Sequence, residues 1–187
     1  MEGKTVFQGK SDSGKEIIIR YPTKADLNAM WEFINALSKE KTFIRFQGEE
    51  ISLEEEEKFL NSHLKKIAQK ESVQLLVFFK GEIIGISDIV MKDKIEKHLG
   101  VFGIIIAKNF RGQGIGKILM EKVIDEARKN LPQLEIIKLN VFANNDLAKS
   151  MYKKFGFVEY GLLPHGIKLE NGYADDVLMY KVVRNRL

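Results

Sequence analysis

Short apolar runs separated by turn residues recur along the chain. They cover about residues 16–21, 73–79, 82–91, 101–107, 136–142, 157–168 and 173–183. Runs of this length, bounded by Gly, Asn and Pro, predict β-strands. Residues 115–127 instead carry apolar side chains at i+4 spacing, which predicts a helix with one face on a sheet and a charged outer face. The alternation of strands and helices predicts a mixed α/β fold.

Capping residues and tight turns delimit these elements. Helices are expected over about residues 23–38, 53–69, 114–129 and 145–155. Thr23 with Asp26 is an N-cap signal, Ser52 with Glu55 forms a capping box, and Gly156 is expected to end the last helix in the left-handed conformation. The pairs at 80–81 (Lys-Gly) and 171–172 (Asn-Gly) predict tight antiparallel hairpins. Pro164 and Gly166 should interrupt the strand before the second hairpin, because proline has no N–H for the ladder.

Length and composition limit the class of protein. A chain of 187 residues is expected to form one domain with a core. Its first dozen residues are expected to be flexible. The sequence contains no apolar stretch long enough for a membrane span and no signal-peptide core, so we expect a cytoplasmic protein without membrane contact. It contains no cysteine, which excludes disulfides, thiolate metal sites and a cysteine acyl-enzyme.

Charge and histidine spacing exclude two further classes. The formal charge is +4, and basic residues are interspersed with acidic ones. Nucleic-acid binding is therefore not indicated. The three histidines, His63, His98 and His165, lie far apart without metal-ligand spacing, so no metal is expected.

The most informative segment is VFGIIIAKNFRGQGIGK, residues 101–117. An apolar strand, a basic residue and three glycines lead directly into a helix, which directs free backbone N–H groups and the positive end of a helix dipole at one point. The segment therefore predicts an anion site, although the glycines alone could serve only a tight turn. Arg111 and Ile118 stand where a Walker loop needs glycine and Ser or Thr, and glycines at 112, 114 and 116 lack Rossmann spacing.

The spacing Arg111-x-x-Gly114-x-Gly116 after an apolar strand resembles the GNAT superfamily of acyl-CoA-dependent N-acetyltransferases. The downstream segment NNDLAKSMYKKFGFVEYG, residues 144–161, is similar to the family's second signature. The resemblance extends over about residues 16–183. It implies acetyl-CoA as cofactor, with the pyrophosphate on the amides of residues 113–118 and the pantetheine arm on the main chain of the preceding strand.

The resemblance also implies which residues contact the cofactor. They are Ile104, Ile105, Ile106, Ala107, Arg111, Gly112, Gln113, Gly114, Ile115, Gly116, Lys117, Ile118 and Asn145. Arg111 and Lys117 could add charge at the phosphates, and Asn145 could serve equally as a helix cap. Tyr152 matches the tyrosine that family members use as general acid toward the departing thiolate, since a phenol of pKa about 10 is protonated at neutral pH. The alternative is a tyrosine that only packs on the core.

The general base is not evident from the sequence. An amine acceptor is mostly protonated at pH 7, so a group must accept a proton before attack. Many family members carry a glutamate on the strand before the glycine loop or on the strand after the following helix, but the second strand has Asn140 here. His98 and Asp88 are the available candidate bases, acting directly or through water, although each taken alone is more typical of a surface or loop residue. Glu82, Asp175 and Asp176 are weaker candidates.

The acceptor site can be placed only by region. Aromatic and basic residues between the first two helices and around the last hairpin are candidates: Phe43, Arg45, Phe46, Tyr160, His165 and Tyr173. Arg45 could pair with the carboxylate of an amino acid or lie solvated in a loop.

Together these observations predict a single domain with a twisted, mostly antiparallel sheet of about six or seven strands and about four helices. The resemblance implies that the sheet is splayed between the strands that start near Val101 and Ile136. The expected activity is transfer of acetyl from acetyl-CoA directly to a primary amine, such as a free amino acid or another small amine. A protein N-terminus or lysine as acceptor, and a non-catalytic CoA-binding module, remain alternatives, and a homodimer is compatible with exposed apolar residues on the last strands.

Overall fold

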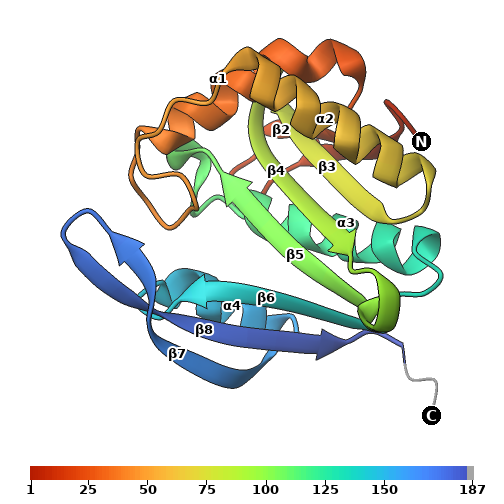
Figure 1. Cartoon of the computed structure of the whole chain (residues 1–187). Helices are drawn as coiled ribbons and strands as arrows, with labels where there is room; N and C mark the ends of the chain where they lie inside the picture. Colours follow the sequence, from red (N-terminus) through yellow and green to blue (C-terminus); the bar gives the residue numbers. More distant parts are fainter. Residues whose placement is uncertain (185–187) are drawn as a thin grey trace.

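The computed structural model describes residues 1–184, which fold around one eight-stranded sheet (Figure 1). The strand order is β1-β2-β3-β4-β5-β6-β8-β7, and β5 and β6 are the parallel pair. The strands are β1 (Thr5–Lys10), β2 (Glu16–Arg20), β3 (Ser72–Phe79), β4 (Glu82–Met91), β5 (Leu99–Ile106), β6 (Ile136–Phe142), β7 (Val158–Leu169) and β8 (Gly172–Val182). The mixed, mostly antiparallel sheet is confirmed.

The sheet has one strand more than the sequence predicted. Residues 5–10, expected to be flexible, form β1 and pair with β2 from Thr5 to Lys10. Val6 and Phe7 pack against the main core, which gives this short strand enough apolar contact to be ordered. The expectation of a flexible first dozen residues is therefore wrong for this segment.

Four α-helices cover the sheet: α1 (Leu27–Ser38), α2 (Leu53–Ala68), α3 (Ile115–Asn130) and α4 (Asp146–Lys154). The helices α1 and α2 lie together on one face, while α3 and α4 lie on the other (Figure 1). The capping box of α2 is formed as expected, with Ser52 Oγ accepting from the Glu55 N–H at 3.2 Å and Glu55 accepting from the Ser52 N–H at 2.8 Å. Gly156 ends α4 at φ 80°, also as expected.

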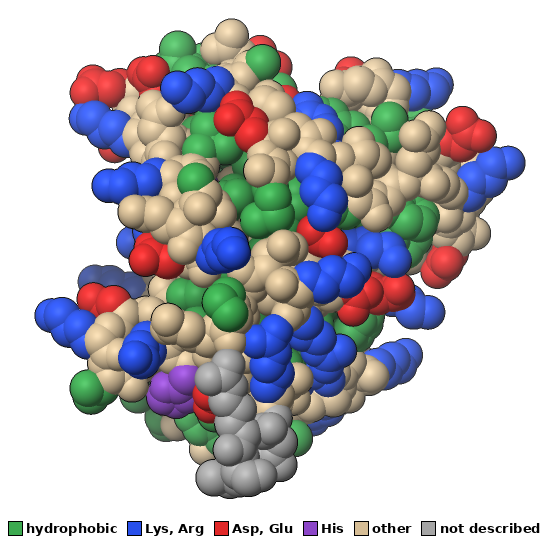
Figure 2. Space-filling model, turned by 90° about the vertical axis from the view of Figure 1, so that its right-hand side faces the viewer, with side chains coloured by type: hydrophobic (Ala, Val, Ile, Leu, Met, Phe, Trp, Pro, Cys, Tyr) green, Lys and Arg blue, Asp and Glu red, His purple; other side chains and the backbone are tan. Residues whose placement is uncertain are grey.

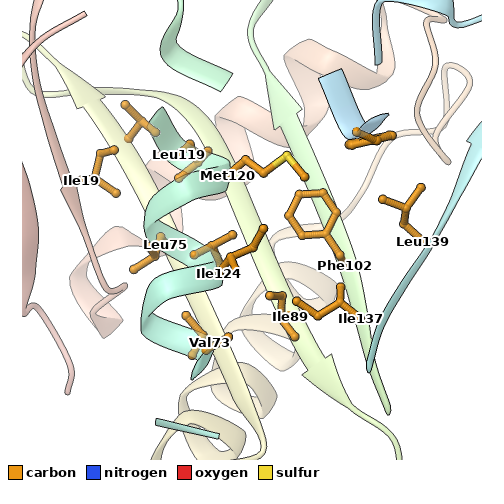
Figure 3. Packing of buried hydrophobic residues seen from close by; sticks show 14 of the residues in the cluster. Ile19, Val73, Leu75, Ile89, Phe102, Leu119, Met120, Ile124, Ile137 and Leu139 are labelled. Carbon is orange, nitrogen blue, oxygen red and sulfur yellow. The ribbon is translucent and has the colours of Figure 1, made fainter. Parts of the chain in front are cut away.

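The main core lies between α3 and the sheet. Figure 3 shows Leu119, Met120 and Ile124 of α3 directed at side chains of the strands beneath, and all three are at most 4 % exposed. A second cluster under α1 and α2 contains Met30, Phe33, Leu37, Leu60, Leu76 and Ile83. The sheet is thus covered by hydrophobic contacts on both faces, which fixes the positions of the strand ends that carry the site.

Both predicted hairpins are present, and β7 is interrupted where expected. The pairing of β7 with β8 shifts between Leu163 and Ile167, the segment that contains Pro164. His165 has φ 56° there, and its N–H donates to Asp175 Oδ1 at 2.8 Å.

The strands β5 and β6 part after three residue pairs. They pair at Leu99–Ile136, Gly100–Ile137 and Val101–Lys138 and then diverge (Figure 1). We refer to the opening between residues 102–106 of β5 and 139–142 of β6 as the gap. This splay is the arrangement that the resemblance implied.

No helix within residues 1–184 combines the length and the apolar character that a membrane crossing requires.

Candidate active site

The glycine loop brings unpaired backbone N–H groups to the carboxyl end of β5. After a short 3₁₀ turn, Gly112 and Gly114 take φ values of 73° and 78°, and α3 begins directly after Gly114 without a side-chain cap. The Ile118 N–H donates to Gly114 O, but the N–H groups of residues 115–117 have no acceptor among the described residues. Three free donors at the positive end of a 16-residue helix are an arrangement suited to binding an anion.

The two glycines of the Gly-x-Gly pair have different surroundings. A Cβ on Gly114 would lie 2.2 Å from Asp12 Oδ2, in the turn between β1 and β2. A Cβ on Gly116 would lie 3.7 Å from Ile106 Cγ1 and 3.8 Å from Met151 Sδ, which are ordinary contacts. Only Gly114 is therefore required by both its backbone conformation and its neighbours.

Arg111 is held by the protein itself. Its Nε donates to Ile106 O at 2.8 Å, and its terminal nitrogen forms an ion pair with Glu40 at 2.5 Å. The guanidinium thereby ties the end of β5 to the segment after α1. Lys117 is exposed and makes no ion pair within residues 1–184. Of the two side chains expected at the phosphates, Lys117 is therefore the one whose charge is not already paired with a carboxylate.

We expect Arg111→Lys to lower the free energy of unfolding by about 1–2 kcal/mol, because an ammonium cannot make both contacts and the pair is partly exposed. Urea unfolding measures this change. Lys108→Arg, at an exposed position three residues earlier, is the control and should leave stability unchanged; equal stabilities of the two variants would contradict the bracing role of Arg111.

Every second residue of β5 directs its main-chain N–H and C=O groups toward the gap. The Ala107 N–H donates to Ile84 O at 2.9 Å, so Ala107 and Ile105 turn their main-chain groups toward β4. Ile104 and Ile106 turn theirs toward the gap, and Ile106 O already binds Arg111. Of the four residues expected to bind the pantetheine arm, only Ile104 and Ile106 thus present main-chain groups to it.

Tyr152 lies where α4 packs beside the gap, on the α3 side of the sheet. Its ring contacts those of Phe102 and Phe157, each with a centroid distance of 6.0 Å. Burial raises the pKa of the Tyr152 hydroxyl to about 12. The hydroxyl makes no hydrogen bond to the described residues and is not among their buried unpaired atoms, so it reaches solvent. Tyr152 therefore presents a neutral O–H donor.

Asn145 serves as the N-cap of α4. Its Oδ1 accepts a hydrogen bond from the Ala148 N–H at 3.2 Å. The capping alternative is thus present in the structure, and a contact with the cofactor stays a prediction.

Asp88 lies on the opposite face of the sheet, the face covered by α1 and α2. Its Oδ1 is 2.9 Å from the position of a Cβ on Gly103, the β5 residue with which it pairs. Its Oδ2 lies 3.3 Å from Nε2 of His63 on α2. The other ring nitrogen of His63 lies 3.1 Å from Phe59 O. Both ring nitrogens therefore face acceptor oxygens, and the two contacts fix the orientation of the imidazole beside Asp88.

The sequence analysis did not identify His63. The usable signal is its position on the apolar side of α2, between Leu60 and Ile67, where a histidine is unusual and needs a partner. Its partner on β4 is 25 residues away in sequence.

His98 is not near the gap. Its carbonyl accepts from the N–H groups of Glu135 and Ile136, at the end of the sheet where β5 and β6 are paired. The eight residues of β5 span about 25 Å at roughly 3.3 Å per residue. The structure therefore separates His98 from the glycine loop by the length of that strand, and Asp88 remains the candidate base.

A cleft of about 470 Å³ opens between the segment after α1 and the tip of the β7–β8 hairpin. Phe43 and Tyr173 line it, and Phe43 contacts Phe142 of β6 edge-to-face at 5.4 Å. Lys41 and Glu170 form an ion pair at 2.5 Å between its two sides. The cleft is continuous with the gap through Phe142, which makes it a candidate acceptor site.

The other expected acceptor residues do not line this cleft. Tyr160 packs on Tyr180 at 5.7 Å, and His165 lies against the Tyr173 ring at 5.5 Å. Arg45 is exposed and Phe46 half-buried in the segment after α1. Of the six acceptor candidates, only Phe43 and Tyr173 therefore line the cleft.

Charged side chains show no segregation on the face viewed in Figure 2, where Lys and Arg lie among Asp and Glu. Within residues 1–184, no three His, Asp or Glu side chains gather as metal ligands.

The family comparison agrees with this geometry. A model described as the acetyltransferase (GNAT) family matches residues 31–157. The chain belongs to the GNAT acetyltransferase family. It is therefore an acyl-CoA-dependent N-acetyltransferase, and acetyl-CoA is the cofactor of its family. The free N–H groups at the start of α3 and the open edge of β5 fit an extended ligand with a pyrophosphate.

Two relatives of the chain are named for small amine acceptors. The chain is 27 % identical over 167 residues to the spermidine N(1)-acetyltransferase of Vibrio cholerae, covering 88 % of this chain and 92 % of the relative. It is 30 % identical over 123 residues to the L-amino acid N-acetyltransferase AaaT of Escherichia coli K12, covering 63 % and 74 %. A GNAT acetyltransferase structure from Streptococcus pneumoniae superposes with a TM-score of 0.83 at 31 % identity, covering 90 % and 100 %.

Proposed function

We propose that this enzyme transfers the acetyl group of acetyl-CoA directly to the primary amine of a small molecule, such as a free amino acid or a polyamine. One observation carries the proposal. The gap in the sheet has the neutral donor Tyr152 on one face and the carboxylate Asp88, paired with His63, on the other. An acid and a base on opposite sides of one opening suit a transfer that both removes and delivers a proton.

The chain's own groups would hold the cofactor in two places. The amides of residues 115–117 and the exposed Lys117 would bind its pyrophosphate, and the main-chain groups of Ile104 would align the pantetheine arm. When bound, acetyl-CoA supplies the activated acetyl group and a thiolate leaving group.

The remaining steps belong to side chains at the gap. Asp88 would accept the proton that the ammonium must lose before attack, directly or through water, and His63 would hold the Asp88 carboxyl in position. The Ile104 N–H would polarise the acetyl carbonyl. The Tyr152 O–H would donate to the departing sulfur. Transfer needs no acyl-enzyme, because the chain contains no cysteine and amine and thioester meet in one site.

The acceptor class is tested by a steady-state screen of thiol release from acetyl-CoA. The panel contains L-amino acids, spermidine, spermine and peptides with free N-termini. We expect saturable turnover on small amines, since the cleft of about 470 Å³ is crossed by the Lys41–Glu170 pair.

Turnover restricted to peptides would refute the small-molecule acceptor. Calorimetric binding of CoA without thiol release on any amine would instead support a non-catalytic CoA-binding module. A subunit arrangement such as a homodimer stays a prediction that sedimentation would measure.

A further inference from the structure

Asn140 and Asp176 form a hydrogen-bonded pair on the β6 side of the gap. Asn140 Nδ2 donates to Asp176 Oδ2 at 2.5 Å. Asn140 stands two residues past Lys138, the last β6 residue paired with β5, and Asp176 pairs with Phe142. Alternate residues of a strand share a face, so both side chains lie on the face that carries Asp88. The carboxyl groups of Asp88 on β4 and Asp176 on β8 therefore share one face of the sheet, each one strand behind a rim of the gap.

The Asp176 carboxyl is short of hydrogen-bond partners. Its side chain is 9 % exposed, and Oδ1 is buried without a partner among the described residues. An ionised carboxylate offers about four acceptor positions, and a buried one that is left under-paired is unfavourable. A positive charge placed near Asp176 is therefore favoured.

The same hydrogen bond fixes the orientation of the Asn140 amide. Its NH₂ must face the carboxyl of Asp176, since an amide oxygen there would be repelled. Oδ1 then points away from Asp176. This oxygen accepts no hydrogen bond within residues 1–184, and Asn140 is an exposed residue, so Oδ1 is open to solvent. Asn140 thus presents a hydrogen-bond acceptor that is backed by a buried carboxyl.

We propose that Asn140 and Asp176 anchor the acceptor amine in its cationic form. An N–H of the ammonium donates to Asn140 Oδ1, and the charge of Asp176 favours the cation without touching it. Asp176 is thus a positioning residue, and Asn140 is the contact. This inference rests on the proposed function and names the side chains that hold its acceptor before the proton is removed. Asp88, across the gap, accepts the proton.

The test measures acceptor and cofactor KM separately in Asp176→Asn, with spermidine and L-alanine as probes. We expect the KM of the accepted amine to rise at least 10-fold, while the KM of acetyl-CoA stays within about twofold. The double exchange Asn140→Asp with Asp176→Asn keeps one amide and one carboxyl in the pair, and moves the carboxyl into the gap. It should restore most of the lost affinity for the amine.

Asp125→Asn is the matched control. It makes the same change of charge at a half-buried position of α3, on the other face of the sheet, and should leave both KM values unchanged. An unaltered amine KM in Asp176→Asn, a parallel rise in both KM values, or a double exchange no better than Asp176→Asn overturns the anchor. If Asp176→Asn does not fold, the double exchange is compared with wild type, and an amine KM more than 10-fold above wild type overturns it.

The proposed function is tested first, by measuring turnover of both probes with the wild-type enzyme. An enzyme that turns over neither probe refutes small-amine acetylation. The anchor is then judged by calorimetric titration of spermidine into the complex with CoA, which Asp176→Asn must weaken at least 10-fold. Absent or unchanged binding overturns the anchor as well.

Discussion

Replacing Tyr152 by phenylalanine should lower kcat by about 10- to 100-fold and leave the affinity for CoA nearly unchanged. The hydroxyl is the neutral donor at the gap, and its loss removes an interaction that matters only as the sulfur departs. Stability should not fall, because the Tyr152 hydroxyl makes no hydrogen bond to the described residues. Steady-state kinetics and thermal melting, measured on the same preparation, test both halves of this expectation.

Tyr21→Phe is the matched control, because it removes the same atom at a site far from the gap. The Tyr21 hydroxyl donates to Glu126 at 3.1 Å, so its loss should reduce the free energy of unfolding by about 1–3 kcal/mol and leave kcat unchanged. A Tyr152→Phe enzyme with wild-type kcat would remove Tyr152 from catalysis. Reduced kcat in both variants would indicate a general structural effect instead.

The pH dependence of Tyr152 follows from its burial. With its pKa raised to about 12, the phenol stays protonated through pH 10, whereas an unfolded tyrosine titrates near 10. Its contribution to stability is therefore complete below pH 10 and is lost as the pH rises from about 10 toward 12. A fall of kcat below pH 10 would have to come from another group.

A methyl group at Gly114 should weaken CoA binding about 10-fold or more, while the same methyl at Gly116 should change it less than about threefold. In Gly114→Ala the new Cβ meets Asp12 Oδ2 at 2.2 Å, and the backbone, at φ 78°, is unfavourable for alanine. The loop must then move, which disturbs the alignment of the N–H groups at 115–117.

Gly116→Ala is the matched control within one turn of helix. Its Cβ has room beside Ile106 and Met151, and alanine is favoured over glycine inside a helix by about 0.5–1 kcal/mol. The variant should therefore be at least as stable as the wild type. Calorimetry with CoA compares each variant with the wild type, and a wild-type affinity in Gly114→Ala would discredit the anion site at the start of α3.

Local signals in the sequence were sufficient for most of the fold. The capping box at Ser52, the last hairpin and the interruption near Pro164 each depend on residues close in sequence, and all three are present. The turn of the hairpin is Glu170-Asn171, one residue earlier than the predicted Asn171-Gly172. The strand β1 was missed because it is short, contains few apolar residues and is followed by a polar turn, as a flexible terminus would be. It is ordered because Val6 and Phe7 contact core residues that are distant in sequence. The splay of the sheet was implied by resemblance, since no periodicity encodes where two strands part.

The site was predictable only where it is local. The loop at 111–116 and Tyr152 stand in contiguous motifs, whereas His63 meets Asp88 across 25 residues and Asn140 meets Asp176 across 36. Such pairs depend on the registers of β4, β6 and β8, which the sequence pattern alone leaves open. The pairing of β5 with β4 also depends on register. It decides that the main-chain N–H and C=O of Ile104, and not those of Ile105, face the gap.

The parting of β5 and β6 leaves the facing edges of both strands without hydrogen bonds to each other. Beyond Val101 and Lys138, each strand keeps a row of peptide groups that a continuous sheet would have joined to each other. In the proposed binding mode, the pantetheine arm of the cofactor would lie along this edge and bond to peptide groups that the parted strands leave unpaired. The hydrogen bonds that β5 and β6 do not make with each other would thus be made with the ligand. The fold gives up part of its own stability at this place and gains affinity for the ligand there.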